Sequence, residues 1–135
     1  MLVVQNTYAE NIQVYWAPGV VSQQTNMVAA ANLVSGQPVK RSEGAIAAIT
    51  DTDVPDGFVL HTVGEGEYVV IVANISKVQL KVSSALYTDI TFEVDDTVYW
   101  STDNSKYTET SNADDTVEIG KVVAVESDYI IVVLK

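Results

Sequence analysis

The sequence pattern most similar to a metal site is a run of acidic residues. Asp51, Asp53 and Asp56 lie in the run DTDVPDG, where carboxylates recur as they do in a calcium-binding loop. The EF-hand pattern also requires an oxygen ligand at its fifth position and a glutamate at its twelfth, and these positions hold Pro55 and Thr62. We therefore interpret the acids as solvated loop residues and expect no metal site. Weak binding of a hard cation is the alternative.

Two adjacent acid pairs, Asp95-Asp96 and Asp114-Asp115, suggest the two carboxylates of a glycoside hydrolase. That chemistry needs carboxyl groups about 5 to 9 Å apart across a cleft, and neighbouring acids in turns seldom meet this requirement. His61 is the only histidine and lies in the strand-like run FVLHTV, without a motif that would make it a catalytic base. We therefore expect no catalytic residue, no cofactor and no enzyme activity.

Aromatic side chains are the stronger functional signal. In the pairs Tyr15-Trp16 and Tyr99-Trp100, one ring lies on each face of a strand, so one ring can pack in the core while the other is exposed. Exposed Trp and Tyr side chains often mark interface hot spots. Core packing is the alternative for both Trp residues.

The same rings support a second hypothesis, a sugar-stacking surface with acids and amides nearby, to which Tyr8, Tyr87 and Tyr107 would also belong. At the N-terminus, the apolar residues Leu2–Val4 either join the sheet of their own domain or add a strand to a neighbouring protein. The candidate interface residues are therefore Leu2, Val3, Val4, Tyr15, Trp16, Tyr99 and Trp100.

Net charge and the absence of cysteine narrow the range of partners. The chain has 135 residues, about one domain, and carries 18 Asp and Glu against 7 Lys and Arg, a net charge of −11. Such a chain repels nucleic acid and anionic membranes, so neither is expected as a partner. Without Cys, stability must come from packing, strand pairing or oligomerisation. Neither a signal peptide nor a run of about 20 apolar residues is visible, and we expect a soluble protein made inside a cell.

The hydrophobic pattern predicts an almost wholly β protein. Residues Lys77–Ser83 alternate polar with apolar side chains, as an exposed edge strand does, whereas Tyr129–Leu134 is apolar on both faces, as a central strand is. One short helix is expected at Asn26–Leu33, where a loop is the alternative. Hairpins are predicted around three turns, Gly64–Gly66, Thr102–Ser105 and Glu126–Asp128.

Two segments, 34–73 and 94–134, repeat one order of features. Each runs from a valine and a turn through two strands, an acidic loop and a glycine to a third strand, and then through an acidic turn and a tyrosine to an apolar strand. The matched residues are Val34 with Val94, Gly57 with Gly120, and Tyr68 with Tyr129.

The repeat predicts a compact barrel or sandwich of short antiparallel strands, formed by two related four-stranded units within residues 34–135. The remaining segment, 1–33, is interpreted as an N-terminal arm that contacts a partner. Chance similarity between two stretches of ordinary β-structure is the alternative explanation of the repeat.

The C-terminal segment VDDTVYWSTDNSKYTETSNADDTVEIGKVVAVESDYIIVVL resembles the signature of a family of small tailed-bacteriophage proteins, the capsid decoration or head-fibre proteins. In that signature a G/D-D-x-V-Y-W-D turn is followed by a short strand, a polar loop, I-G-x-V and a closing V-x-V-x-L strand. LVSGQPVKRSEGAIAAI is similar to its earlier half, so the resemblance covers roughly Val34 to Lys135. The first 33 residues depart from the pattern and carry a VYW of their own at Val14–Trp16.

The resemblance implies an all-β, non-catalytic virion protein that is made in the host cytoplasm and sits on the outer capsid surface. Its partners would be the major capsid protein and further copies of itself, typically in a homotrimer. A carbohydrate- or host-surface-binding β-module of a phage or bacterium is the alternative, with a surface glycan as its partner.

Overall fold

The protein is all-β, as predicted, and its described residues include one short 3-10 turn, η1, at Ser84–Leu86. The computed structural model describes residues 11–19, 23–50, 53–88, 90–111 and 115–135. The strands of these residues are β1 (Ile12–Trp16), β2 (Gln23–Ala29), β3 (Pro38–Ser42), β4 (Ala45–Ala48), β5 (Gly57–Val59), β6 (Tyr68–Ala73), β7 (Gln79–Ser83), β8 (Thr97–Ser101), β9 (Lys106–Thr108), β10 (Thr116–Val125) and β11 (Tyr129–Leu134).

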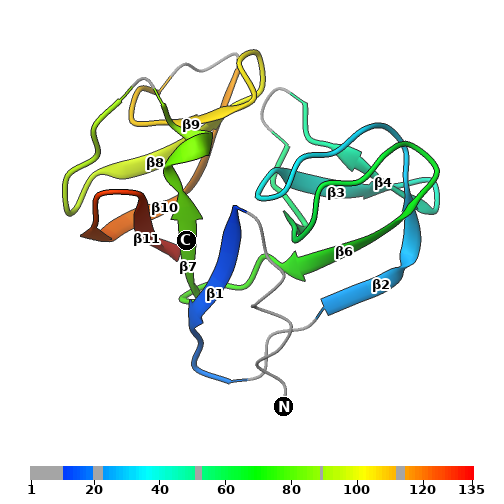
Figure 1. Cartoon of the computed structure of the whole chain (residues 1–135), viewed down its shortest axis with the longest axis horizontal. Coiled ribbons are helices and arrows are strands. Elements are labelled where there is room, and N and C mark those ends of the chain that lie inside the picture. Colours follow the sequence, from blue (N-terminus) through cyan, green and yellow to red (C-terminus); the bar gives the residue numbers. More distant parts are fainter. Residues whose placement is uncertain (1–10, 20–22, 51–52, 89, 112–114) are drawn as a thin grey trace.

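The strands form two sheets, which appear as two lobes in Figure 1. One sheet is a closed barrel in the order β2-β4-β3-β5-β6, in which β2 and β4 are parallel and all other neighbours are antiparallel. The other sheet is open and antiparallel, in the order β1-β7-β11-β10-β8-β9. Within the described part of the chain, β1 and β9 are therefore its two edge strands.

Two successive five-strand segments pair in the same order, and we call β2 to β6 unit 1 and β7 to β11 unit 2. In each unit the second and third strands form a hairpin, and the fourth strand pairs with the second. The fifth strand then pairs with both the fourth and the first. The repeated segments 34–73 and 94–134 contain four strands each, β3 to β6 and β8 to β11, which is the number that the sequence repeat predicted, and each unit adds one strand before its repeat, β2 or β7.

The turn that leads into the second strand is held by the same two hydrogen bonds in both units. In unit 1 the N–H of Gln37 donates to the carbonyl oxygen of Val34 (3.0 Å), and the side-chain Oε1 of Gln37 accepts the N–H of Val34 (3.0 Å). In unit 2 the N–H of Asp96 donates to the carbonyl oxygen of Glu93 (3.1 Å), and Oδ2 of Asp96 accepts the N–H of Glu93 (2.8 Å). The two turns are thus equivalent in main chain and in side chain.

Each of these turns contains one residue in the left-handed region, Gly36 (φ 88°) and Asp95 (φ 77°), two residue types that tolerate this conformation. The hydrogen bonds match Val34 with Glu93, one residue away from the sequence alignment, which matched Val34 with Val94. The origin of the two units by duplication stays a prediction. The units also share one order of strand pairing.

Gly57 and Gly120 hold equivalent places because the fifth strand of each unit passes very close to them. A Cβ on Gly57 would lie 2.6 Å from the carbonyl oxygen of Val72, and a Cβ on Gly120 would lie even closer to the carbonyl oxygen of Val133. Real Cβ atoms do not make such contacts with a backbone oxygen, so the pairing of the fourth and fifth strands requires glycine at both positions.

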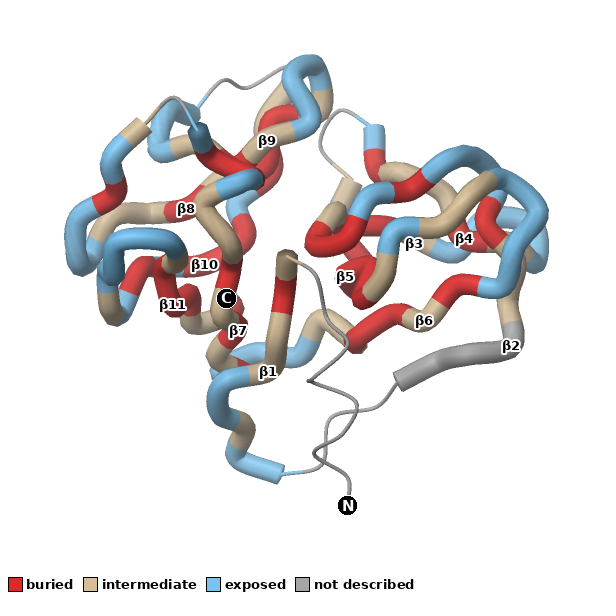
Figure 2. The backbone as a smooth tube through the Cα atoms, in the orientation of Figure 1, coloured by how far each residue is buried: buried red, intermediate tan, exposed pale blue. Residues whose placement is uncertain are grey.

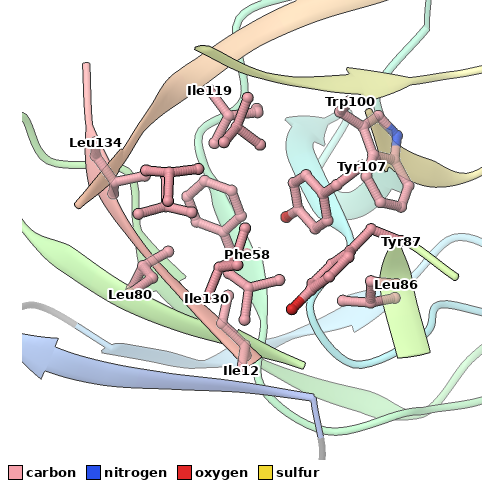
Figure 3. Packing of buried hydrophobic residues seen from close by; sticks show 14 of the residues in the cluster. Ile12, Phe58, Leu80, Leu86, Tyr87, Trp100, Tyr107, Ile119, Ile130 and Leu134 are labelled. Atoms are coloured by element: carbon pink, nitrogen blue, oxygen red, sulfur yellow. The ribbon is translucent and has the colours of Figure 1, made fainter. Parts of the chain in front are cut away.

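The two units share one hydrophobic core. Phe58 and Leu60 of unit 1 belong to the same buried cluster as Trp100 and Ile130 of unit 2, and Figure 3 shows Phe58 surrounded by side chains of the other unit. Figure 2 shows the buried segments of both lobes, including all of β5. A smaller cluster fills the interior of the barrel and consists of Ala29, Leu33, Val39, Ile46, Val59, Val69 and Ile71.

One buried hydrogen bond also joins the units. The hydroxyl of Tyr107, on β9, donates to the carbonyl oxygen of Gly36 in the turn of unit 1 (2.6 Å). Tyr107 is almost fully buried, and this burial raises the pKa of its hydroxyl well above the ordinary value. The shared core and this bond make the two lobes one packed body.

The predicted helix at Asn26–Leu33 is wrong, since Gln23–Ala29 forms β2. The alanine-rich sequence suits a helix, but β2 pairs with β6 through Val28 and Tyr68 and with β4 through Val28 and Ala45. These pairings, made with residues distant in sequence, outweigh the local propensity.

The predicted edge position of β7 is also wrong, because β7 lies between β1 and β11. Lys81 is accommodated on this inner strand by its neighbour, since its Nζ lies 4.2 Å from the centroid of the Tyr129 ring in a cation–π contact. The three predicted hairpins are confirmed by the antiparallel pairs β5–β6, β8–β9 and β10–β11, and the predicted central position of β11 is confirmed as well.

Replacement of Gly120 by Ala should destabilise the protein strongly. The new Cβ would collide with the carbonyl oxygen of Val133, so that β10 and β11 must move apart. We expect a loss of about 2 kcal/mol or more in the free energy of unfolding, measured by urea denaturation. Gly19→Ala is the matched control because a Cβ at Gly19 meets no atom within 4 Å. Equal stability of the two variants would contradict the close approach.

Replacement of Tyr107 by Phe should remove the hydrogen bond between the units and destabilise the protein. The carbonyl of Gly36 loses its buried donor, which should cost about 1 to 2 kcal/mol in urea denaturation at neutral pH. Because the folded protein raises the pKa of Tyr107, the wild type should also lose stability as pH rises above 10, the ordinary pKa of tyrosine, where only the unfolded chain ionises. The variant should lose less stability over this alkaline range, and an equal loss would contradict the assignment.

Candidate functional site

The acidic candidates serve turns and loops. Asp53 accepts hydrogen bonds from Lys40 Nζ (2.5 Å) and from the N–H and hydroxyl of Thr50, and these bonds hold the pKa of Asp53 below its ordinary value, with the Lys40 bond as the largest cause. Asp56 accepts the main-chain N–H of Arg41 (2.8 Å). Asp51 lies outside the described residues. The run DTDVPDG is thus fastened by its own chain, at least through Asp53 and Asp56.

The two acid pairs behave in the same way. Asp95 and Asp96 form the turn into β8, and the carboxyl group of Asp96 also interacts with that of Glu109. Burial raises the pKa of Glu109, and the interaction with Asp96 and the repulsion from Glu93 raise it further. Asp114 lies outside the described residues, and Asp115 accepts the N–H and the hydroxyl of Thr102 at its main-chain oxygen (2.8 and 3.1 Å).

Three further features predicted from the sequence concern the single histidine, metal binding and membrane spans. His61 is half-buried on the chain between β5 and β6. Over the described ranges, no group of three or more His, Asp or Glu side chains could hold a metal ion. In the same residues no helix has the length and apolar character that crossing a membrane requires.

The aromatic pair on β1 is exposed. Tyr15 and Trp16 are 59% and 51% exposed, although alternation along a strand would bury one of them. The cause is a bulge, because Val14 pairs with Leu80 and Trp16 with Gln79, which leaves Tyr15 as an extra residue. Two large rings therefore lie together on the edge strand of the open sheet.

The aromatic pair on β8 has a different environment. Trp100 is only 3% exposed and packs edge to face against Tyr107, with ring centroids 4.8 Å apart. Trp100 is therefore a core residue of this chain and does not lie on the surface where we expected a contact. Tyr99 is half-buried on the opposite face of β8. The remaining interface candidates, Leu2–Val4, lie outside the described residues.

Tyr87, Trp100 and Tyr107 were expected to contribute to a sugar-stacking surface, but all three are buried. Tyr107 and Tyr87 are buried together with Trp100, and Tyr87 packs edge to face against Phe92. Burial raises the pKa of Tyr87 to about 12, with a smaller contribution from the charge of Asp128. Tyr8 lies outside the described residues.

A polar hollow of about 400 Å³ lies beside these buried rings, at the end of unit 2 where β8 and β9 are joined. Most of its lining comes from residues 101–110 and 115–116, and Tyr87 and Ile90 complete it. Sequence reasoning interpreted this polar stretch as a hairpin turn and an acidic loop, and it did not predict that Tyr87 and Ile90 pack beside them. Hydroxyl groups dominate the lining, which includes Ser101, Asn104, Lys106, Thr108, Thr110 and Thr116.

Comparison with protein-family models, with curated proteins and with solved structures found no match. The functional argument therefore depends on the chain itself. Its two candidate sites are the aromatic edge, defined as Tyr15 and Trp16 on β1, and the polar hollow of unit 2.

Replacement of each Trp by Ala should separate the two roles of the aromatic residues. Trp100→Ala removes a buried ring and should cost about 3 to 5 kcal/mol in the free energy of unfolding. Trp16→Ala removes a half-exposed ring and should cost less than about 1 kcal/mol. Urea denaturation followed by circular dichroism measures both, and a large loss in Trp16→Ala would show that Trp16 is a structural residue.

Proposed function

We propose that this protein is a structural virion protein, a capsid decoration or head-fibre protein that binds the outside of a phage head. The single observation that carries the proposal is the aromatic edge, where Tyr15 and Trp16 are exposed together on an edge strand of a tightly packed β-body. Rigid aromatic side chains of this kind supply much of the binding energy of protein interfaces.

The surroundings of the aromatic edge support a protein partner. An edge strand offers unpaired main-chain groups to a further strand, and β1 is such an edge in the described sheet. Of the described acids, Glu118 is the only one that lies on a strand. The negative charge is thus concentrated in loops, and β1 itself carries no charged residue.

The proposed attachment works through several weak contacts at once. A trimer would present three aromatic edges, and each bound edge raises the effective concentration of the others at the capsid. The acidic loops would keep free trimers apart and would be attracted to a basic patch on the shell. The proposal assigns the protein no catalytic role.

The test is co-sedimentation of the purified protein with expanded phage heads, preceded by sedimentation analysis of the free protein. We expect a trimer that binds the heads, and we expect Tyr15→Ala and Trp16→Ala each to weaken binding about tenfold. Tyr68→Ala is the matched control, since Tyr68 is 71% exposed and lies on the barrel instead of β1. A monomer that does not bind heads, or equal loss in the control, would overturn the proposal.

A further inference from the structure

Units 1 and 2 differ at one seam, the gap between the first and third strands of each unit. In unit 1 this seam is closed by the parallel pairing of β2 with β4, in which Val28 is opposite Ala45. The strand registers make Ser83 the counterpart of Val28 and Lys106 the counterpart of Ala45. A β7–β9 pair would therefore close unit 2, but β7 pairs with β1 along that edge.

The open seam of unit 2 is the origin of the polar hollow. After β7 the chain turns away through η1, and Tyr87 and Ile90 then line the hollow opposite Lys106 and Tyr107 of β9. A side-chain hydrogen bond spans this region, from Lys106 Nζ to the hydroxyl of Thr88 (2.7 Å). The volume of the hollow, about 400 Å³, lies in the range of small-molecule pockets.

The groups in the hollow are held ready to donate hydrogen bonds. The hydroxyl oxygen of Ser101 accepts the N–H of Asn104 (3.2 Å), and the hydroxyl oxygen of Thr108 accepts the N–H of Thr110 (3.2 Å). With its oxygen engaged in this way, each hydroxyl directs its own proton elsewhere. The side-chain amide of Asn104 adds both a donor and an acceptor.

This set of groups fits a polyhydroxylated ligand. Sugars present closely spaced hydroxyls that both donate and accept, which hydroxyl and amide side chains can match. An anionic ligand is disfavoured because the carboxylate of Asp115 lines the hollow together with Lys106, the one cation among the described lining residues, and offsets its charge. An apolar ligand would cover the hydroxyl groups of Ser101 and Thr108 without accepting their protons.

We propose that the open seam of unit 2 is a carbohydrate site, which binds one uncharged sugar residue of a glycan among Ser101, Asn104 and Thr108. Unit 1 has no equivalent site because its seam is closed by strand pairing. The site lies on β8 and β9, whereas the aromatic edge lies on β1 at the opposite edge of the sheet. The proposal goes beyond the capsid-binding role and does not depend on it.

The test is an NMR titration of the isotope-labelled full chain with glucose, galactose, mannose, N-acetylglucosamine and N-acetylgalactosamine at up to tens of millimolar. We expect at least one sugar to shift saturably the amide signals around Ser101, Asn104 and Thr108. The acyclic polyol sorbitol is the control for solvent effects. Absence of saturable shifts with every sugar, or equal shifts with sorbitol, would overturn the proposal.

Two variants locate the site. Asn104→Ala and Thr108→Val each remove a polar group of the hollow, and each should weaken binding of the active sugar about three- to tenfold. Ser76→Ala, an exposed residue between β6 and β7, is the matched control and should bind as the wild type does. Unchanged sugar affinity in both hollow variants would overturn the proposal. Head co-sedimentation of the same variants should be unaffected, so failure of one proposal is distinguishable from failure of the other.

Discussion

The packing of unit 1 against unit 2 is the constraint on which the rest of the structure depends. Each sheet buries part of its apolar surface only against the other, because Phe58 and Leu60 of unit 1 lie in the same cluster as Trp100 and Ile130 of the open sheet. The chain has no cysteine and therefore no disulfide, and burial of apolar surface in this shared cluster is a main source of its stability. The Tyr107–Gly36 hydrogen bond fixes the relative position of the units at the centre of this contact.

The two units share one order of strand pairing but present different surfaces. Unit 1 closes on itself, whereas β1 occupies the edge of unit 2 that would otherwise close. Two consequences follow: β1 becomes an exposed edge with two aromatic rings, and β9 leaves a seam with a polar hollow. The aromatic edge and the hollow are therefore products of the same departure from symmetry, and both are held in place by the shared core.

Sequence reasoning succeeded where the signal is local and failed where it is not. The polar turn residues at 102–105 and 126–128 predict their hairpins, and the continuous apolar run of β11 indicates a central strand. The strand β2 was missed because an alanine-rich stretch suits a helix until its distant partners are known. Likewise, exposure of both Tyr15 and Trp16 depends on a bulge against β7, and the hollow depends on which strand takes the edge of unit 2. Neither leaves a pattern in neighbouring residues.

Native-state hydrogen exchange in increasing urea tests the shared core most directly. If the two units form one packed body, the slowest amides of β5 and β6 and those of β10 and β11 should exchange with the same free energy and the same dependence on urea, equal to those of global unfolding. Exchange of the barrel amides at a lower free energy and with a smaller urea dependence, while the open sheet stays protected, would contradict the account.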